Sequence, residues 1–416
     1  MACESDDSSA AEPQFNASTF QAQITRVLDI KNNRNPSDLE IRLNKAANNT
    51  FISEYRIFFV PDAEKQNVDA ATARELNEDQ FLSLPNSFVP AGVSFSEDQL
   101  DFNGTAIMDD TLYVAFVLTV GIFNEEAVFV LSEASNSFSI VNRLEVRTLI
   151  NDFPANDGLF VSEEGTIFAS DFGTFSNTTG MGDGTTVYEV TPNGNLSEKA
   201  TGFKAPMGGV LDSQGNFYFT HENEGVSGDI IKVAPDGSST VVGAVDGWPS
   251  GLTIDENDII YVANFVSPNV HRITPDGTIT LFATDNRLAG CVGIDIDGEG
   301  NVVTANFATA EILSINSAAE VALITQIPDL PANFAIGYMT IFENAIYATG
   351  IGDHYIYRIN FDGSTEIFAG TGSNGSTDGE LEAASFSSPN GIAADNQRRI
   401  LYISQFGSPG LRQIQF

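Results

Sequence analysis

One line of sequence recurs along the last two thirds of this chain, and it limits the possible folds more than any other feature. The line GLTIDENDIIYVANF occupies residues 251–265, and variants of it stand at 209–223, 293–307 and 391–406. Each copy begins with glycine and a short apolar run, passes an aspartate and a polar turn, and ends in a second apolar run. Two strand-length apolar runs around a polar turn are typical of a β-hairpin. The sequence therefore predicts one hairpin, repeated.

The spacing of the copies predicts a β-propeller. The first glycine of each unit recurs at intervals of 51, 42, 42, 44 and 54 residues. A period of this size, with about four short strands per unit, is typical of propeller blades. Six units thus predict six blades over residues 144–416, with the glycine-led strand innermost, where glycine lets backbones crowd around the axis. These glycines are Gly158, Gly209, Gly251, Gly293, Gly337 and Gly391.

The last unit lacks an outer strand, because the sequence stops at LRQIQF, its third strand. The segment LEVRTLI at 144–150 precedes the first unit and is spare. We expect this segment to pair with the last strand and close the ring without an exposed edge.

Residues 19–143 show a different pattern. Short alternating segments such as 20–30, 37–46 and 111–120 are separated by turn residues, which predicts a β-sandwich. The segment DAATARELNEDQFLSL at 69–84 predicts one helical insertion. TLYVAFVLTV at 111–120 resembles a late strand of a fibronectin type III domain. The expected fold class is all-β, with a fibronectin type III-like sandwich followed by a six-bladed propeller.

Charge and cysteine content limit the possible partners and the possible disulfide bonds. The chain has 56 acidic and 19 basic residues, a net charge of −37. This excess repels phosphate backbones, so nucleic acid is a poor partner. Cys3 and Cys291 are the only cysteines, so no disulfide framework is expected.

The first residues, ACESDDSSAAEP after Met1, resemble a bacterial lipoprotein after cleavage of its signal peptide. The resemblance implies a lipid on Cys3, a disordered tether over residues 1–18, and a place in the cell envelope outside the cytoplasm. The membrane would then be reached only through this lipid. The alternative is an ordinary disordered N-terminus. We expect a monomer.

Strand parity divides the propeller loops between two faces. The loops after the second and fourth strands of each blade share one face, which we call the loop face. It carries the long and uneven loops, whereas the other face carries stereotyped turns such as PDG at 275–277. Variable loops on a rigid scaffold are where binding usually occurs. We therefore expect a small molecule, a glycan or a protein to bind at the loop face.

Candidate ligand-binding residues stand where second strands end and just before first strands begin. Oxygen donors suit Ca²⁺ or another divalent cation, and amides beside aromatic rings suit sugars or peptides. The alternative is that the amides cap strand ends and the rings pack between blades. Phenylalanine follows the second strand in four units, at Phe172, Phe265, Phe307 and Phe406. The predicted ligand-binding residues are Asp171, His221, Glu222, Trp248, Asn264, Phe265, Asn306, Tyr338 and Gln405.

Two family resemblances bear on function. The lines GWPSGLTIDENDIIYVAN at 247–264 and SPNGIAADNQRRILYIS at 388–404 resemble NHL repeats, which implies a propeller but no particular activity. PNG at 389–391 and NDG at 156–158 are distantly similar to the six-bladed gluconolactonase and senescence-marker family. That similarity implies a divalent cation held by Asn390 and Asp157, and lactone hydrolysis. Ser250 stands where the family has a third, acidic ligand, so the implied site is incomplete.

The favoured function is binding at the loop face of a cell-envelope lipoprotein. A metal-dependent hydrolase or lyase with its site at the mouth of the propeller channel is the alternative. Whether the chain is an enzyme stays open at this point, and no catalytic residue is assigned.

Overall fold

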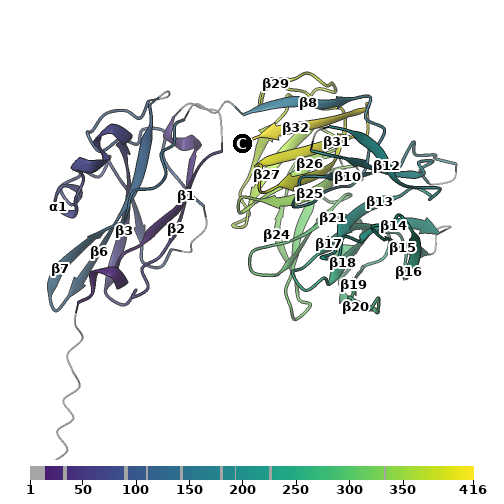
Figure 1. Cartoon of the computed structure of the whole chain (residues 1–416), viewed down its shortest axis with the longest axis horizontal. Helices are drawn as coiled ribbons and strands as arrows, with labels where there is room; N and C mark the ends of the chain where they lie inside the picture. Colours follow the sequence, from purple (N-terminus) through teal and green to yellow (C-terminus); the bar gives the residue numbers. More distant parts are fainter. Residues whose placement is uncertain are drawn as a thin grey trace, which may run out of the picture. The chain divides into compact units, whose positions relative to one another are not determined.

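The computed structural model describes residues 15–30, 35–88, 92–108, 111–140, 144–178, 181–192, 194–223, 227–331 and 334–416. Cys3, the predicted lipid site, lies outside the described residues. The contacts within the chain divide it into two units, Met1–Arg143 and Leu144–Phe416 (Figure 1). Within the described ranges, no helix has the length and apolar character that a membrane crossing requires.

The first unit contains two antiparallel sheets that share one apolar core. Its strands are β1 (Gln23–Asp29), β2 (Leu39–Asn44), β3 (Ile52–Pro61), β4 (Leu82–Pro85), β5 (Val93–Ser94), β6 (Tyr113–Phe123) and β7 (Glu126–Leu131). One sheet has the order β1-β2-β5 and the other β4-β3-β6-β7. Buried Ile41 of the first sheet belongs to the same cluster as Tyr55 and Val117 of the second. The resemblance to a fibronectin type III domain stays a prediction.

The helix expected over residues 69–84 is wrong beyond its first turn. The α-helix α1 covers only Ala70–Ala73, and Leu82–Pro85 form strand β4. Leu84 of β4 pairs with Tyr55 of β3, so this stretch is held by the sheet. Tertiary pairing has overridden the helical preference of the local sequence. The unit also has three short 3₁₀ helices, η1 (Ala17–Thr19), η2 (Pro36–Asp38) and η3 (Asp62–Asn67).

The second unit is a β-propeller with six blades, as the six repeats predict. Five blades are four-stranded sheets, and the sixth is a five-stranded sheet. Blades one to three comprise β9 (Leu159–Val161), β10 (Ile167–Ser170), β11 (Thr186–Val190) and β12 (Leu196–Thr201); β13 (Met207–Leu211), β14 (Phe217–Asn223), β15 (Ser227–Val233) and β16 (Ser239–Asp246); and β17 (Pro249–Ile254), β18 (Ile260–Asn264), β19 (Asn269–Ile273) and β20 (Ile279–Thr284). Blades four and five comprise β21 (Cys291–Ile296), β22 (Val302–Asn306), β23 (Glu311–Ile315) and β24 (Val321–Gln326); and β25 (Ile336–Phe342), β26 (Ala345–Gly350), β27 (Tyr355–Asn360) and β28 (Thr365–Ala369). Blade six comprises β30 (Pro389–Asp395), β31 (Ile400–Gln405), β32 (Gly410–Gln415) and β8 (Glu145–Asn151), with β29 (Gly379–Glu380) added outside β8; η4 (Asn286–Leu288) joins blades three and four.

The first strands of neighbouring blades contact one another in a closed series, β9, β13, β17, β21, β25, β30 and back to β9. The glycines at their centres are required by this crowding. A Cβ on Gly251 would lie 2.1 Å from the carbonyl oxygen of Val292, and a Cβ on Gly391 would lie 2.1 Å from that of Asp157. Neither contact is sterically possible, so these positions admit only glycine without a backbone shift.

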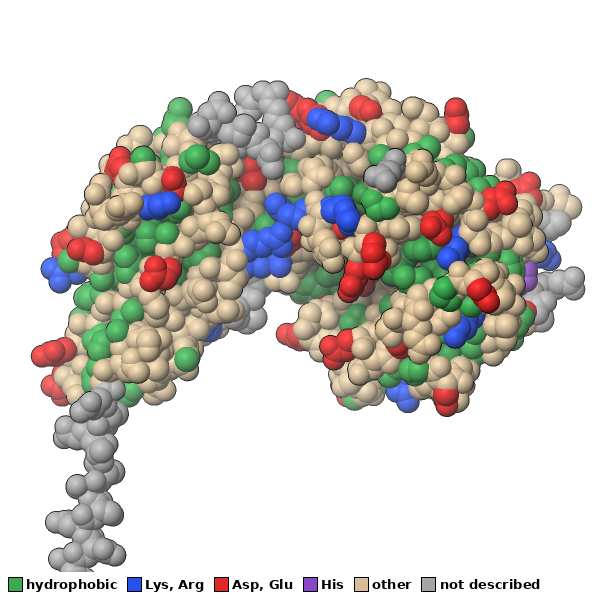
Figure 2. All heavy atoms as spheres, viewed as in Figure 1, with side chains coloured by type: hydrophobic (Ala, Val, Ile, Leu, Met, Phe, Trp, Pro, Cys, Tyr) green, Lys and Arg blue, Asp and Glu red, His purple; other side chains and the backbone are tan. Residues whose placement is uncertain are grey.

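Acidic side chains in the propeller serve its turns. Asp212, Asp255 and Asp297 follow the first strands of three blades, and each accepts hydrogen bonds from backbone N–H groups of its own turn. This is the usual role of aspartate in tight turns. On the face shown in Figure 2, aspartate and glutamate (red) are spread over both units. The acidity is thus distributed rather than gathered into one patch on that face.

The ring closes as the spare segment predicts. β8, which precedes the first blade, pairs antiparallel with β32 at the end of the chain, with Ile150 opposite Leu411. The N-terminal strand of the propeller and its C-terminal strand therefore lie in one sheet, and the free edge of β32 is covered.

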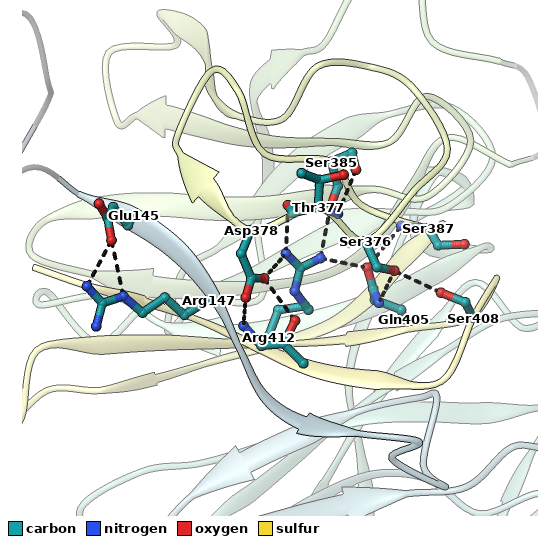
Figure 3. A network of polar contacts seen from close by, with 11 residues as sticks. Glu145, Arg147, Ser376, Thr377, Asp378, Ser385, Ser387, Gln405, Ser408 and Arg412 are labelled. Carbon is teal, nitrogen blue, oxygen red and sulfur yellow. Dashed lines mark hydrogen bonds and ion pairs between the residues drawn. The ribbon is translucent and has the colours of Figure 1, made fainter.

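A buried arginine fastens this closure (Figure 3). Arg412 of β32 is fully buried, and its guanidinium donates to the carbonyl oxygens of Ser385 (2.9 Å) and Thr377 (3.0 Å) and pairs with Asp378 (2.8 Å). Asp378 also accepts from the backbone N–H (3.0 Å) and hydroxyl (2.8 Å) of Thr148 in β8. Arg412 thus joins the last strand, the closing strand and the loop between β28 and β30.

We predict that Arg412→Met lowers the free energy of unfolding of the propeller by about 3 kcal/mol, because it leaves buried carbonyl groups without their donor and removes the cationic partner of Asp378. Urea unfolding followed by the fluorescence of Trp248, the only tryptophan in the chain, measures this. Arg147→Met is the matched control. Arg147 lies on β8, is 69% exposed and pairs with Glu145, so its loss should cost less than about 0.5 kcal/mol. Equal effects of the two substitutions would contradict the role given to Arg412.

Candidate functional site

A cavity of about 410 Å³ hollows the loop face of the propeller, and we call it the aromatic cup. Its lining comes from residues that follow second strands and from residues just before, or at the start of, first strands. Seven of the twelve lining residues in the described chain are aromatic. The lining residues are Asp157, Phe172, Phe175, Met207, Trp248, Phe265, Val292, Phe307, Phe334, Ile351, Asn390 and Phe406.

The repeat places a phenylalanine in the cup from four blades. Phe265, Phe307 and Phe406 each follow the last residue of a second strand. The backbone N–H of each donates to a carbonyl oxygen at the start of its own blade, and all three bonds measure 2.8 Å. Ile351 follows the second strand of blade five in the same way, and Phe172 stands two residues after the second strand of blade one. One backbone arrangement, repeated, thus directs apolar side chains at a single hollow.

The rings contact one another along the wall of the cup. Neighbouring ring centroids are between 5.4 and 6.3 Å apart. Three of the contacts are edge-to-face, which is a favoured aromatic geometry. The series runs Phe334, Phe307, Phe265, Trp248, Phe172 and Phe406. The wall is therefore assembled by packing among its own side chains.

Asn264, which precedes Phe265, holds the loop that carries this ring. It is 1% exposed. Its Oδ1 accepts from the backbone N–H groups of Trp248 (3.0 Å), Val266 (3.0 Å) and Ser267 (2.7 Å), and its Nδ2 donates to the carbonyl oxygen of Asp246 (2.5 Å). Both the oxygen and the nitrogen of this amide are therefore engaged within the protein.

Asn306 and Gln405 occupy the same position in blades four and six, and both are 1% exposed. Asn306 accepts from two backbone N–H groups in its own loop and donates to the carbonyls of Arg287 and Ala289. Gln405 accepts from the backbone N–H of Ser387. Neither they nor Asn264 are among the described lining residues of the cup. The structure gives these predicted ligand-binding amides the capping role that the sequence left as the alternative.

The remaining predicted residues separate into three groups. Trp248 and Phe265 line the cup, and the Tyr338 hydroxyl donates to the lining residue Asp157. His221 accepts the backbone N–H of Lys204 at 2.8 Å and is a cap like Asn264. Asp171 is partly buried and does not line the cup among the described residues; the side chain of Glu222 is not described. Phe175, Val292, Phe334 and Ile351 line the cup without having been predicted.

The base of the cup holds one carboxyl group. Asp157, which is 7% exposed, accepts from the hydroxyl of Tyr338 (2.5 Å) and the backbone N–H of Gly158 (2.8 Å) at Oδ1, and from Asn390 (3.1 Å) at Oδ2. The Tyr338 hydroxyl also accepts from the backbone N–H of Gly208 at 3.3 Å. Tyr338 lines a second hollow of about 280 Å³ between the first strands. The hydrogen bond between Tyr338 and Asp157 therefore lies between this second hollow and the cup.

Burial dominates the electrostatics of Asp157. It raises the pKa of the carboxyl to about 6, although the hydrogen bonds from Tyr338, Gly158 and Asn390 act in the opposite direction. The negative charge of Asp171 raises the pKa further. Burial and the Asp157 charge likewise raise the pKa of Tyr338, so its hydroxyl remains a donor. With this raised pKa, Asp157 changes its charge in mildly acidic solution.

The raised pKa of Asp157 predicts a pH-dependent stability. The folded protein binds this proton more tightly than the unfolded chain, so the contribution of Asp157 to the free energy of unfolding falls as pH rises and levels off above about 6. The free energy of unfolding of the wild type minus that of Asp157→Asn should fall by about 2 kcal/mol between about pH 4 and pH 7. Urea unfolding across this range measures the difference, which cancels the contributions of other carboxyl groups. A difference that is flat in pH would show that the carboxyl is not desolvated.

The residues at the channel mouth do not fit the cation that the lactonase resemblance implies. Asn390, the second implied ligand, turns its amide nitrogen rather than its oxygen toward Asp157, because Nδ2 donates to Asp157 Oδ2 (3.1 Å) and to the carbonyl oxygen of Asn156 (2.9 Å). Ser250, at the third position, is buried and donates to the carbonyl oxygen of Cys291 at 2.8 Å. In the described chain, no three or more His, Cys, Asp or Glu residues are grouped so as to hold a metal ion. No chemistry through a metal is derived for this site.

No family model matches the sequence, and no curated protein matches it. Solved structures do. An auxiliary nutrient binding protein from Bacteroides ovatus is 13% identical over 97% of this chain and 99% of its own, with a TM-score of 0.54. A second one, from Bacteroides thetaiotaomicron, is 12% identical over 96% and 99%, with a TM-score of 0.54. A protein of unknown function from the same species is 12% identical over 95% and 98%, with a TM-score of 0.55. At these identities the likeness shows the fold.

Proposed function

We propose that this protein is a ligand-binding protein of the bacterial cell envelope, and that the aromatic cup binds a small molecule with an apolar, ring-bearing body. The observation that carries the proposal is the convergence of aromatic side chains from five blades on one hollow. Its volume of about 410 Å³ lies within the range of small-molecule sites. An exposed aromatic concavity of this kind is costly to keep in water unless it serves binding.

The composition of the lining limits the chemical class of ligand that the cup can bind. Apart from the Trp248 indole, Asp157 and Asn390 are the hydrogen-bonding side chains among the described lining residues. A ligand with many hydroxyl groups would lose its hydration here without gaining partners. An apolar ring gains both burial and stacking. A free glycan is thus disfavoured relative to a compact aromatic or alicyclic molecule.

Two further arguments support a binding role outside the cytoplasm. Two structures that share this fold along nearly the full chain are named auxiliary nutrient binding proteins. The sequence around Cys3 resembles a lipoprotein start, and a lipid there would hold the propeller at a membrane surface. The first unit then acts as a spacer or a second contact. The proposal is therefore for a binding role.

The proposal is tested with Prodan, a neutral fluorescent dye with a ring-bearing apolar body. We expect saturable binding that also changes the fluorescence of Trp248, which lines the cup. Phe265→Ala and Phe307→Ala should each weaken binding about tenfold, because each removes a buried ring contact.

The control for these variants is Val266→Ala, because Val266 neighbours Phe265 but is 58% exposed and does not line the cup in the described chain. Its affinity for the dye should match that of wild type. Absence of saturable binding, or an equal loss in Val266→Ala, would exclude the cup as the site.

A further inference from the structure

We propose that the aromatic cup selects ligands that carry a positively charged amine, and that Asp157 binds this group. The inference rests on the proposed function, since it names the class of ligand for the same site.

The cup has one charged residue and nothing to balance it. No lysine, arginine or histidine is among its described lining residues, whereas Asp157 is. The titratable groups that act on Asp157 are Tyr338, a neutral donor, and Asp171, which carries the same sign of charge. A buried carboxylate without a cation is costly. A ligand ammonium would supply the missing counter-charge.

The wall of the cup favours the same ligand. The faces of aromatic rings attract cations, and tryptophan does so best. Trp248 and Phe172 lie 6.2 Å apart in a stacked arrangement, and Trp248 meets Phe265 edge to face at 5.6 Å. Aromatic walls above a single carboxyl group combine both attractions for an amine on an apolar body. An anionic ligand meets neither, and is further repelled by the net charge of −37.

Asp157 has the capacity to bind a further donor. Its Oδ1 accepts from Tyr338 and Gly158, whereas its Oδ2 accepts from Asn390 alone in the described chain. A carboxylate oxygen accepts two hydrogen bonds without strain. Asn390 also donates to the carbonyl oxygen of Asn156 at 2.9 Å, so it is held in place independently. An ammonium group at Oδ2 therefore need not displace the existing bonds. The raised pKa of Asp157 agrees with a carboxyl that lacks a cationic partner.

The test compares three probes of nearly equal size at pH ~7.5, well above the Asp157 titration. These are 2-phenylethylamine, 2-phenylethanol and phenylacetate, which are cationic, neutral and anionic. Displacement of Prodan gives their affinities. We expect the amine to bind at least about tenfold more tightly than the alcohol, as a charge-assisted hydrogen bond would provide, and the acid to bind most weakly.

Asp157→Asn should remove the preference for the amine, so that the amine and the alcohol bind this variant with affinities within about twofold of each other, because the ring contacts that they share remain. The control is Asp183→Asn, which removes an exposed acidic group outside the described lining and should keep the preference. If Asp157→Asn does not fold, the three probes on the unaltered protein decide the question.

The inference is overturned if the alcohol binds as tightly as the amine to the unaltered protein, or if the amine keeps its advantage in Asp157→Asn. In either case Prodan binding that is weakened by Phe265→Ala would leave the proposed function standing. Failure of the dye itself to bind would instead remove the proposed function.

Discussion

The packing of six first strands around one axis is the constraint on which the rest of this structure depends. Their backbones approach so closely that the positions of Gly251 and Gly391 leave no room for a Cβ. Each blade buries its two faces only against neighbouring blades. An open row of blades would therefore expose one face at each end to water. The closing pair of β8 and β32, fastened by Arg412, is what turns the repeat into a ring. A rigid ring in turn gives the loop face a fixed geometry.

At that face, two adjacent residues of the repeat have different roles. The amide at the end of a second strand, as in Asn264, is buried and saturates the backbone groups of its loop. The phenylalanine after it is thereby held toward the axis. Because unsatisfied backbone groups are costly, the amide cannot easily be exchanged for a ligand contact. The side chains of the aromatic wall do not bond the loop backbone, so they can vary without loosening the loops.

Asp157 stands apart from this scheme, because it places a carboxyl group at the base of an apolar hollow. Burial penalises its charge, and Tyr338, Gly158 and Asn390 offset the penalty only in part. A structure that only needed stability would be better served by a neutral residue here. The cost is understandable if the charge acts on something that enters the cup.

Much of the architecture was predictable from the sequence, because a short repeat expresses itself in local patterns. The glycine spacing, the hairpin turns and the spare strand at 144–150 are each visible over a few residues, and they determined the propeller and its closure. The stretch 69–84 shows the limit of local reasoning, since pairing of β4 with β3 displaced the expected helix. At the site, the sequence determined that an amide and a phenylalanine recur together at the mouth. Only the tertiary structure decided that the amides face inward as caps while the rings meet in one cup with Asp157 and Phe334, because burial and ring contacts depend on residues that are brought together by closure and are far apart along the chain.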